Sequence, residues 1–133
     1  MEKIVITGMG TVNPLGLNVA DTWQNIINGV SGGAPITRFD ASGWQAQIAC
    51  EVKGFDPKNY MPMKEARRRD RFEQFGVVAA QEALQSSGLE VTPENAGRIG
   101  ILVSSAMGGL ESLQEAIYTL KDHGARRVSP FLI

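Results

Sequence analysis

Two short apolar runs constrain the fold of this chain more than any other feature of its sequence. Residues 3–7 (KIVIT) and residues 99–103 (IGILV) are rich in β-branched side chains, and a glycine or small-residue turn follows each of them. Continuous apolar runs of this length are typical of strands that are covered on both faces, as in parallel sheets. The sequence therefore predicts an α/β protein in which both runs are buried strands.

Three amphipathic helices are predicted beside these strands. Residues 18–29 carry an apolar stripe and begin with Asn18 as an N-cap, residues 64–88 end at Gly88, and residues 110–124 show leucine and isoleucine at helical period. The second helix also has a face of small residues that would let another backbone approach closely. These residues are Gly76, Ala79, Ala80 and Ala83.

The segments between the helices contain turn signals and one further strand pattern. Residues 31–35 (SGGAP) are predicted as a loop, and residues 92–94 (TPE) as a helix cap that opens one short turn. Residues 47–53 alternate between polar and apolar side chains, which predicts a half-buried strand with Cys50 on its buried face.

Composition fits one ordinary globular domain. The chain has 133 residues, of which 43% are hydrophobic and 20% charged, and its 13 basic and 14 acidic side chains nearly cancel. No apolar run approaches the roughly 20 residues of a membrane-spanning helix, and the overall charge gives no reason to expect nucleic acid or a membrane as partner. The single cysteine fits a reducing compartment, so a cytoplasmic or plastid-stroma location is expected.

A basic run at residues 64–71 (KEARRRDR) departs from this near-neutral balance. Helical spacing would place Lys64, Arg67, Arg68 and Arg71 on one face, with an apolar stripe on the other. Such a patch suggests a specific anionic partner, although cations also solvate the surface end of a buried helix. The residues alone leave both interpretations open.

Two turns carry patterns that suggest ligand binding. Residues 8–16 (GMGTVNPLG) follow a predicted strand, but the third glycine comes too late and Pro14 delays the helix, which argues against a dinucleotide site. Residues 104–109 (SSAMGG) could offer backbone amides to an anion or let a substrate pass closely. A tight strand-to-helix connection explains the second turn equally well.

No reactive centre can be assembled from the remaining residues. Cys50 alternates with core positions and is predicted to be a buried structural thiol, and His123 lies at a helix end where its charge favours the helix dipole. No spacing of His, Cys, Asp or Glu fits a metal site, and no Ser/His/Asp set can be built. The sequence therefore predicts no catalytic residue and no metal ligand in this chain.

An ordered set of motifs resembles the opening of β-ketoacyl-acyl-carrier-protein synthases, specifically the type II elongating condensing enzymes. The resemblance extends over essentially the whole chain. The motifs are residues 5–10 (VITGMG), 13–16 (NPLG), 22–23 (TW), 29–32 (GVSG), 38–40 (RFD), 64–72 (KEARRRDRF), 104–110 (SSAMGGL) and 126–131 (RRVSPF).

The resemblance implies an α/β, thiolase-like layered αβαβα fold, of which residues 1–133 would be the first part of the N-terminal repeat. It also implies an incomplete N-terminal domain. The nucleophilic cysteine, two histidines and a lysine of the family follow the segment that matches residues 129–131, so the catalytic residues are expected downstream. Cys50 is not expected to replace the missing nucleophile.

Binding residues are also implied by the resemblance. The positions that dock an acidic acyl carrier protein correspond to Lys64, Arg67, Arg68, Arg126 and Arg127. Met107 corresponds to a gate residue of the acyl pocket. A methionine at this position resembles the plastid-type members of the family. Its flexible thioether could repack around acyl chains of different length.

For the intact protein, the resemblance implies fatty-acid elongation by decarboxylative condensation of an acyl-enzyme with malonyl-acyl carrier protein. The partners would be the carrier protein, acyl and malonyl thioesters, and a second copy in a homodimer. No cofactor of its own is implied, since phosphopantetheine is carried by the carrier protein. Two alternatives stay open: a non-catalytic subunit resembling a chain-length factor, and a stand-alone module that binds the carrier protein.

Overall fold

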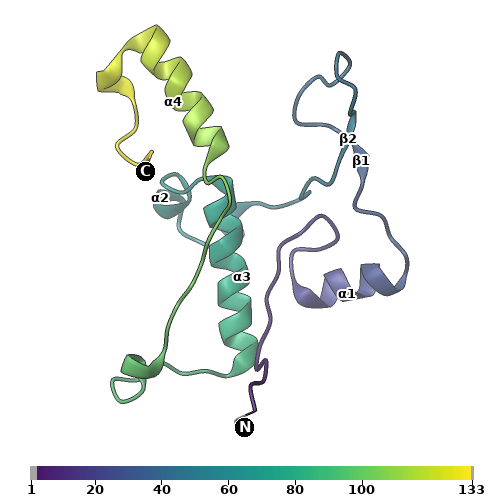
Figure 1. Ribbon diagram of the computed structural model, residues 1–133, viewed down its shortest axis with the longest axis vertical. Helices are drawn as coiled ribbons and strands as arrows, with labels where there is room; N and C mark the ends of the chain where they lie inside the picture. Colours follow the sequence, from purple (N-terminus) through teal and green to yellow (C-terminus); the bar gives the residue numbers. More distant parts are fainter. Residues whose placement is uncertain (1–2, 133) are drawn as a thin grey trace. The chain divides into compact units, whose positions relative to one another are not determined.

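The computed structural model describes residues 3–132, which divide into two compact units (Figure 1). One unit comprises the chain up to Phe55 together with Val78–Leu89, and the other comprises Asp56–Val77 and the chain from Glu90 onward. We call them unit 1 and unit 2. Helix α3 (Arg71–Ser87) belongs to both, because its N-terminal part lies in unit 2 and the rest in unit 1.

Unit 1 contains helix α1 (Val19–Ile27) and a short antiparallel ladder. The side chain of Asn18 accepts a hydrogen bond of 2.7 Å from the Asp21 amide, so the predicted N-cap is confirmed. Strand β1 (Ala34–Pro35) pairs with β2 (Ile48–Ala49). Residues 31–35, predicted as a loop, thus contribute one strand of this ladder.

The N-terminal segment of unit 1 crosses α3 at very short range. A Cβ atom at Gly10 would overlap the backbone carbonyl oxygen of Ala79, and one at Gly8 would overlap that of Ala83. Only glycine fits at such a crossing. The predicted close approach of a backbone to the small-residue face of α3 is confirmed, and it gives residues 8–16 a packing role.

Unit 2 contains α2 (Met63–Ala66), the start of α3, α4 (Leu110–His123) and three short 3-10 turns. These turns are η1 (Pro57–Asn59), η2 (Ala96–Arg98) and η3 (Ala125–Arg127). The predicted ends of α3 and α4 are confirmed, because Gly88 and Gly124 follow them with φ of 65° and 79°.

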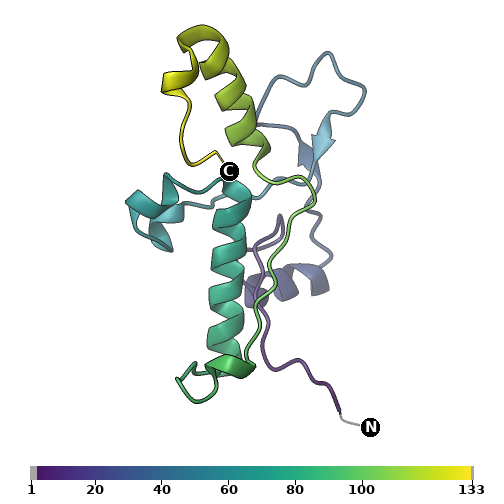
Figure 2. The same ribbon diagram turned by 60° about the vertical axis from the view of Figure 1, so that its left-hand side comes forward.

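The two predicted buried strands are not formed among the described residues. Residues 3–7 and 99–103 pair with no described segment, and their side chains lie in solvent, with Ile4 98% and Leu102 94% exposed. A strand needs a neighbour for its backbone hydrogen bonds and layers over its faces, and neither segment finds these here. Residues leading into α4 instead run beside the N-terminal part of α3 (Figure 1, Figure 2).

The prediction for Cys50 is also wrong. Only residues 48–49 of the predicted strand at 47–53 pair with a neighbour, and the Cys50 thiol is exposed. The alternating pattern identified a ladder, but no second layer covers its apolar face within the described chain.

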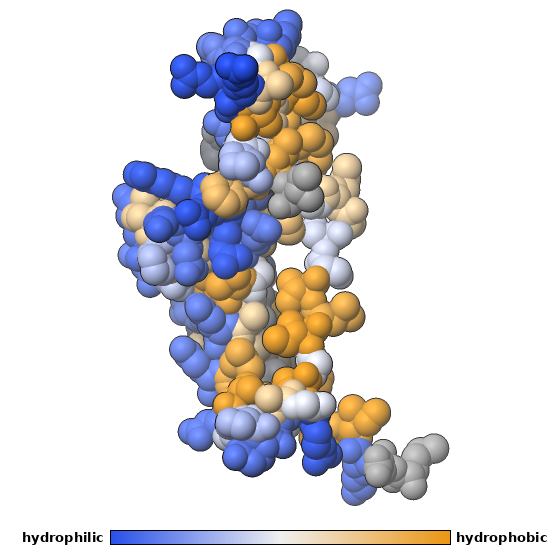
Figure 3. Space-filling model, turned by 90° about the vertical axis from the view of Figure 1, so that its left-hand side faces the viewer, coloured by the Kyte–Doolittle hydropathy of each residue, from blue (hydrophilic) through white to orange (hydrophobic). Residues whose placement is uncertain are grey.

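Burial within each unit is limited to a few apolar side chains. These are Ala41, Phe55 and Val78 in unit 1, and Met61, Ala66 and Ala116 in unit 2. In Figure 3 the surface over α2 and the segment after it is mostly hydrophilic, whereas the surface over α4 shows hydrophobic patches. Over α4, hydrophilic and hydrophobic surface lie side by side in this view.

Candidate functional site

The middle of the basic run of unit 2 lies in a linker between two helices. Helix α2 ends at Ala66, Arg67 is its C-cap residue, and α3 begins at Arg71. The prediction of one continuous helix over residues 64–88, with Lys64, Arg67, Arg68 and Arg71 on a single face, is therefore wrong. We call residues 67–69 the arginine linker.

Asp70 explains where the helix breaks. Its backbone amide donates a 3.1 Å hydrogen bond to the Glu73 carboxylate, and its carbonyl oxygen accepts the first helical bond from the Gln74 amide. The Glu73 bond is one half of a capping box, for which the residues D-x-x-E at 70–73 are the sequence signal. The prediction of one continuous helix, which was based on helical spacing across the basic run, did not take this signal into account.

Gln74 holds the arginine linker against the first turn of α3. Its side-chain amide donates to the carbonyl oxygens of Ala66 at 2.9 Å and Arg69 at 3.1 Å. These bonds satisfy backbone acceptors on both sides of the linker. The arginines therefore project from a backbone that is fixed at both ends.

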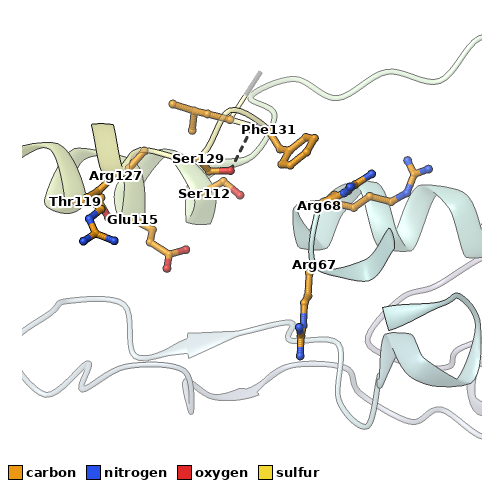
Figure 4. A pocket seen from close by; sticks show the side chains of 11 residues that line it. Arg67, Arg68, Ser112, Glu115, Thr119, Arg127, Ser129 and Phe131 are labelled. Atoms are coloured by element: carbon orange, nitrogen blue, oxygen red, sulfur yellow. Dashed lines mark hydrogen bonds between the residues drawn. The ribbon is translucent and has the colours of Figure 1, made fainter. Parts of the chain in front are cut away.

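Arginines from two distant segments line one pocket of unit 2 (Figure 4). The pocket has a volume of about 220 Å³. The arginine linker lies on one side, and α4 with the chain after it lies on the other. The lining residues are Arg67, Arg68, Arg69, Ser112, Glu115, Ala116, Thr119, Arg127, Ser129, Phe131 and Leu132.

The charge of this basic pocket is strongly positive. Four guanidinium groups line it against the single carboxylate of Glu115. The Arg68 guanidinium stacks over the Phe131 ring, with 4.8 Å from Cζ to the centroid, and Arg69 is 3.8 Å from the Glu65 carboxylate in an exposed pair. Stacking orients Arg68 while it keeps its charge, and the exposed pair contributes little.

Three of the five predicted docking residues meet at this pocket. Arg67, Arg68 and Arg127 line it, whereas Lys64 on α2 and Arg126 on η3 lie outside its lining within the described chain. Arg69 also lines the pocket and was not predicted, because the helical face assumed for the run excluded it.

Met107 lies in the turn before α4, where its side chain is 73% exposed. Gly108 adopts a φ of 67°, and its amide donates to Ser105 Oγ at 3.2 Å. The predicted strand-to-helix connection at residues 104–109 is met only in part, because a bend leads into α4 but no strand precedes it among the described residues. The positive φ explains a glycine at position 108. Met107 does not line the basic pocket.

The Asp70 carboxylate connects the start of α3 to the start of α4. Its Oδ2 atom accepts a 2.9 Å hydrogen bond from the Ser112 amide. Burial raises the pKa of Asp70, but hydrogen bonds from Ser112 and from the amides of Arg71 and Phe72 outweigh it and hold the pKa below its ordinary value of 3.8. The carboxylate is therefore ionised at neutral pH.

Other candidate chemistries find no support in the described chain. His123 is the last residue of α4, where a cap-region position was predicted. Among the described residues, no cluster of three or more His, Cys, Asp or Glu side chains is placed to hold a metal ion. Within residues 3–132, no helix is both long and apolar enough to cross a bilayer.

A basic pocket of this kind, beside a small-residue turn, is typical of a chain that recognises an anionic partner. The family model described as "Beta-ketoacyl synthase, N-terminal domain" matches residues 1–133, and the chain belongs to this family. The expected family is confirmed.

Curated relatives agree with this assignment. The chain is 45% identical over 135 residues to "3-oxoacyl-[acyl-carrier-protein] synthase 2" of Coxiella burnetii, covering 100% of this chain and 33% of the relative. It is 42% identical to the protein of the same name from Staphylococcus aureus, covering 99% of this chain and 32% of the relative. The chain thus spans about a third of the length of these relatives.

Solved structures show the same fold. A β-ketoacyl synthase from Burkholderia phymatum is 25% identical with a TM-score of 0.75, covering 99% of this chain and 33% of that one. "The ishigamide ketosynthase/chain length factor" is 27% identical with a TM-score of 0.72, covering 96% of this chain and 32% of that one. The predicted thiolase-like α/β fold is confirmed, and the chain represents part of it.

Proposed function

We propose that this chain is the N-terminal part of a β-ketoacyl-acyl-carrier-protein synthase that elongates fatty acids. Within that protein, residues 1–133 would form the first part of the N-terminal domain. They would contribute the docking surface for the acyl carrier protein and part of the acyl pocket. The catalytic residues would follow in the remainder of the protein, so this chain by itself is expected to be inactive.

The convergence of two basic segments on one pocket is the observation that carries this proposal. Arg67 and Arg68 precede Arg127 by about sixty residues, yet all three line the same 220 Å³ pocket. An acidic carrier protein would meet several cations at once, which favours rapid and oriented association. Lys64 and Arg126 would extend the positive surface on either side.

In the proposed reaction, an acyl group is transferred from its carrier to the cysteine of the intact enzyme. Malonyl-carrier protein then loses carbon dioxide, and the resulting carbanion attacks the acyl thioester. A carbon–carbon bond forms and the enzyme thiolate leaves. Cys50 and His123 take no part in these steps.

The proposed substrates are acyl and malonyl thioesters of the carrier protein, in which the phosphopantetheine of the carrier supplies the sulfur of each thioester. The enzyme needs no cofactor of its own. One solved neighbour, "AntDE:AntF (apo): type II PKS acyl-carrier protein in complex with its ketosynthase bound to the hexaketide", supports a carrier protein as partner. We further propose a cytoplasmic homodimer; the bacterial origin of the curated relatives favours the cytoplasm over a plastid stroma.

Met107 is proposed as a gate of the acyl pocket. Its exposed side chain precedes Gly108, whose positive φ fixes the turn. A thioether on a defined turn can swing between rotamers at little cost and accommodate chains of different length. The gate would therefore act on the acyl chain, while the arginines act on the carrier protein.

Carrier-protein affinity of the full-length gene product tests this proposal. The double variant Arg67→Glu/Arg68→Glu should weaken binding of an acidic acyl carrier protein by about tenfold to a hundredfold, chiefly through slower association. The control Arg98→Glu reverses one charge on η2 and should alter affinity by less than about twofold, whereas Arg67→Glu or Arg68→Glu alone should exceed that effect.

Ionic strength provides the second readout. The difference between wild type and the double variant should nearly vanish as ionic strength rises from about 0.01 M to about 1 M, because the Debye length falls from about 30 Å to about 3 Å. Equal affinities at low ionic strength would remove the docking role. Absence of condensation by the wild-type gene product would remove the enzymatic role.

A non-catalytic subunit resembling a chain-length factor is the second candidate. The structural likeness to a ketosynthase/chain length factor at 27% identity favours it to a limited degree. The higher identities of 45% and 42% to proteins named as synthases favour the enzyme. Condensing activity of the purified gene product decides between the two.

A further inference from the structure

We propose that Asp70 is a positioning residue that anchors the Met107 turn to the arginine linker. The proposal rests on the proposed function, since it assigns the gate and the docking segment a common support. Asp70 ends the arginine linker at residues 67–69, and its carboxylate contacts the beginning of α4, which directly follows the turn at residues 104–109. One side chain thus joins the two elements to which separate roles are assigned.

Helix α4 depends on Asp70 for its N-terminal hydrogen bonding. Its N-cap residue is Gly109, which has no side chain to accept from the first turn. The Ser112 amide is one of the first-turn donors that have no acceptor within the helix, and Asp70 Oδ2 accepts it at 2.9 Å. The carboxylate therefore does for α4 what an N-cap side chain does in other helices.

Gly109 packs directly against the same carboxylate. A Cβ atom at this position would lie 2.7 Å from Asp70 Oδ2 and 3.0 Å from its Cγ atom. Contacts this short are not tolerated, so any side chain at 109 would displace the carboxylate or the turn. Met107 lies two residues before this contact, and its placement follows the placement of Gly109.

The backbone groups of Asp70 stabilise the end of the arginine linker. Its amide donates to Glu73, its carbonyl oxygen accepts from Gln74, and the Gln74 side chain binds the carbonyl oxygens of Ala66 and Arg69. These contacts are all within unit 2. The backbone of the linker and the beginning of α4 therefore share one hydrogen-bonded support, and a shift of Asp70 would move the gate while the arginines keep their charges.

The ratio of activities toward long and short acyl chains tests this role in the full-length enzyme. Loss of folded enzyme lowers kcat/KM for every substrate equally and leaves the ratio unchanged, whereas displacement of the gate changes it. Asp70→Ala should change the ratio of kcat/KM for a long and a short acyl substrate by at least about threefold. Asp122→Ala, at an exposed aspartate of α4, is the matched control and should leave the ratio unchanged.

Gly109→Ala alters the contact with the Asp70 carboxylate from the α4 side. It should change the same ratio, and combination with Asp70→Ala should give less than the product of the two single effects, because the added methyl group then meets no carboxylate. A ratio that stays at the wild-type value in both single variants would overturn the proposal. If the wild-type enzyme neither condenses nor binds the carrier protein, the proposed function fails instead.

Amide exchange in the wild-type protein covers the case in which neither variant folds. The Ser112 amide should exchange far more slowly than an unprotected amide, because its acceptor is Asp70 and lies outside α4. Exchange of Ser112 at the unprotected rate would show that the anchor does not exist and would overturn the proposal without any substitution.

Discussion

The two units use the same device at the two ends of α3, and they differ in what it supports. In unit 1, the Glu82 carboxylate accepts from the amides of Val19 at 2.8 Å and Thr11 at 2.9 Å. In unit 2, the Asp70 carboxylate accepts from the amide of Ser112. In both cases a carboxylate of one helix or its cap satisfies the start of another helix.

The difference lies in whether the supported helix has an N-cap side chain of its own. Helix α1 carries its own N-cap, Asn18, which accepts from the Asp21 amide, so Glu82 has to satisfy only the remaining amide of Val19. Helix α4 begins at Gly109 without a side-chain cap and depends on Asp70. Asp70 also adjoins the basic pocket, whereas Glu82 holds a segment that packs on α3. The same chemistry thus supports packing in one unit and the basic pocket in the other.

The largest effect is expected from adding a methyl group at the crossing in unit 1. Gly10→Ala would bring Cβ against backbone atoms of Ala79 and Ala83, and a helix backbone cannot move aside. In Gly109→Ala, by contrast, the added methyl group meets the Asp70 side chain, which can rotate away. Unfolding of the full-length gene product in denaturant should show a loss of about 2–3 kcal/mol.

Gly43→Ala is the control for this substitution, because no atom lies within 4 Å of the position that its Cβ would take. It should change the unfolding free energy by less than about 0.5 kcal/mol. Equal stability of the Gly10 and Gly43 variants would mean that the N-terminal segment does not cross α3 as described.

An intermediate effect is expected from Glu82→Ala. It removes the acceptor for two amides, which should cost about 2 kcal/mol of unfolding free energy. Because α1 retains Asn18, the helix itself should persist, and circular dichroism of the folded protein should be unchanged. Glu90→Ala, at an exposed position, is the control; a loss as large as that of Glu82→Ala would contradict the anchoring role.

The smallest effect is expected from Asp70→Asn, and it should depend on pH. The pKa of Asp70 is below its ordinary value of 3.8 in the folded protein, so its contribution is complete above that value and is lost as pH falls through the folded pKa. At neutral pH the variant should be less stable by about 1 kcal/mol.

The gap between wild type and Asp70→Asn should narrow below about pH 4, where the Asp70 carboxylate of the unfolded chain begins to take up a proton before that of the folded protein does. Denaturant unfolding at several pH values measures it. A gap that is constant from neutral to acidic pH would mean that the charge of Asp70 contributes nothing and that only its shape matters.

Local signals were predicted well from the sequence. The Asn18 cap and the glycines after α3 and α4 each depend on a few neighbouring residues, and all are confirmed. Features that depend on partners distant in the sequence were not predicted correctly. Residues 3–7 and 99–103 have the composition of buried strands, yet they find no ladder partner among the described residues.

The candidate site shows the same division. Family resemblance identified Arg67, Arg68 and Arg127, but helical spacing placed the first two on a helix that in fact ends before them. The D-x-x-E pattern at residues 70–73 was readable from the sequence and would have predicted the break. The contact between Asp70 and α4 was not readable, because 42 residues separate Asp70 from Ser112.

The sequence by itself determined the family, the helix boundaries marked by caps and glycines, and the two clusters of arginine. Each of these depends on the identity of adjacent residues, which local chemistry can interpret. Only the tertiary structure decided that Arg67, Arg68 and Arg127 share one pocket and that Asp70 serves the helix after the Met107 turn. Such pairings depend on how the chain folds back on itself, and no local propensity encodes that path.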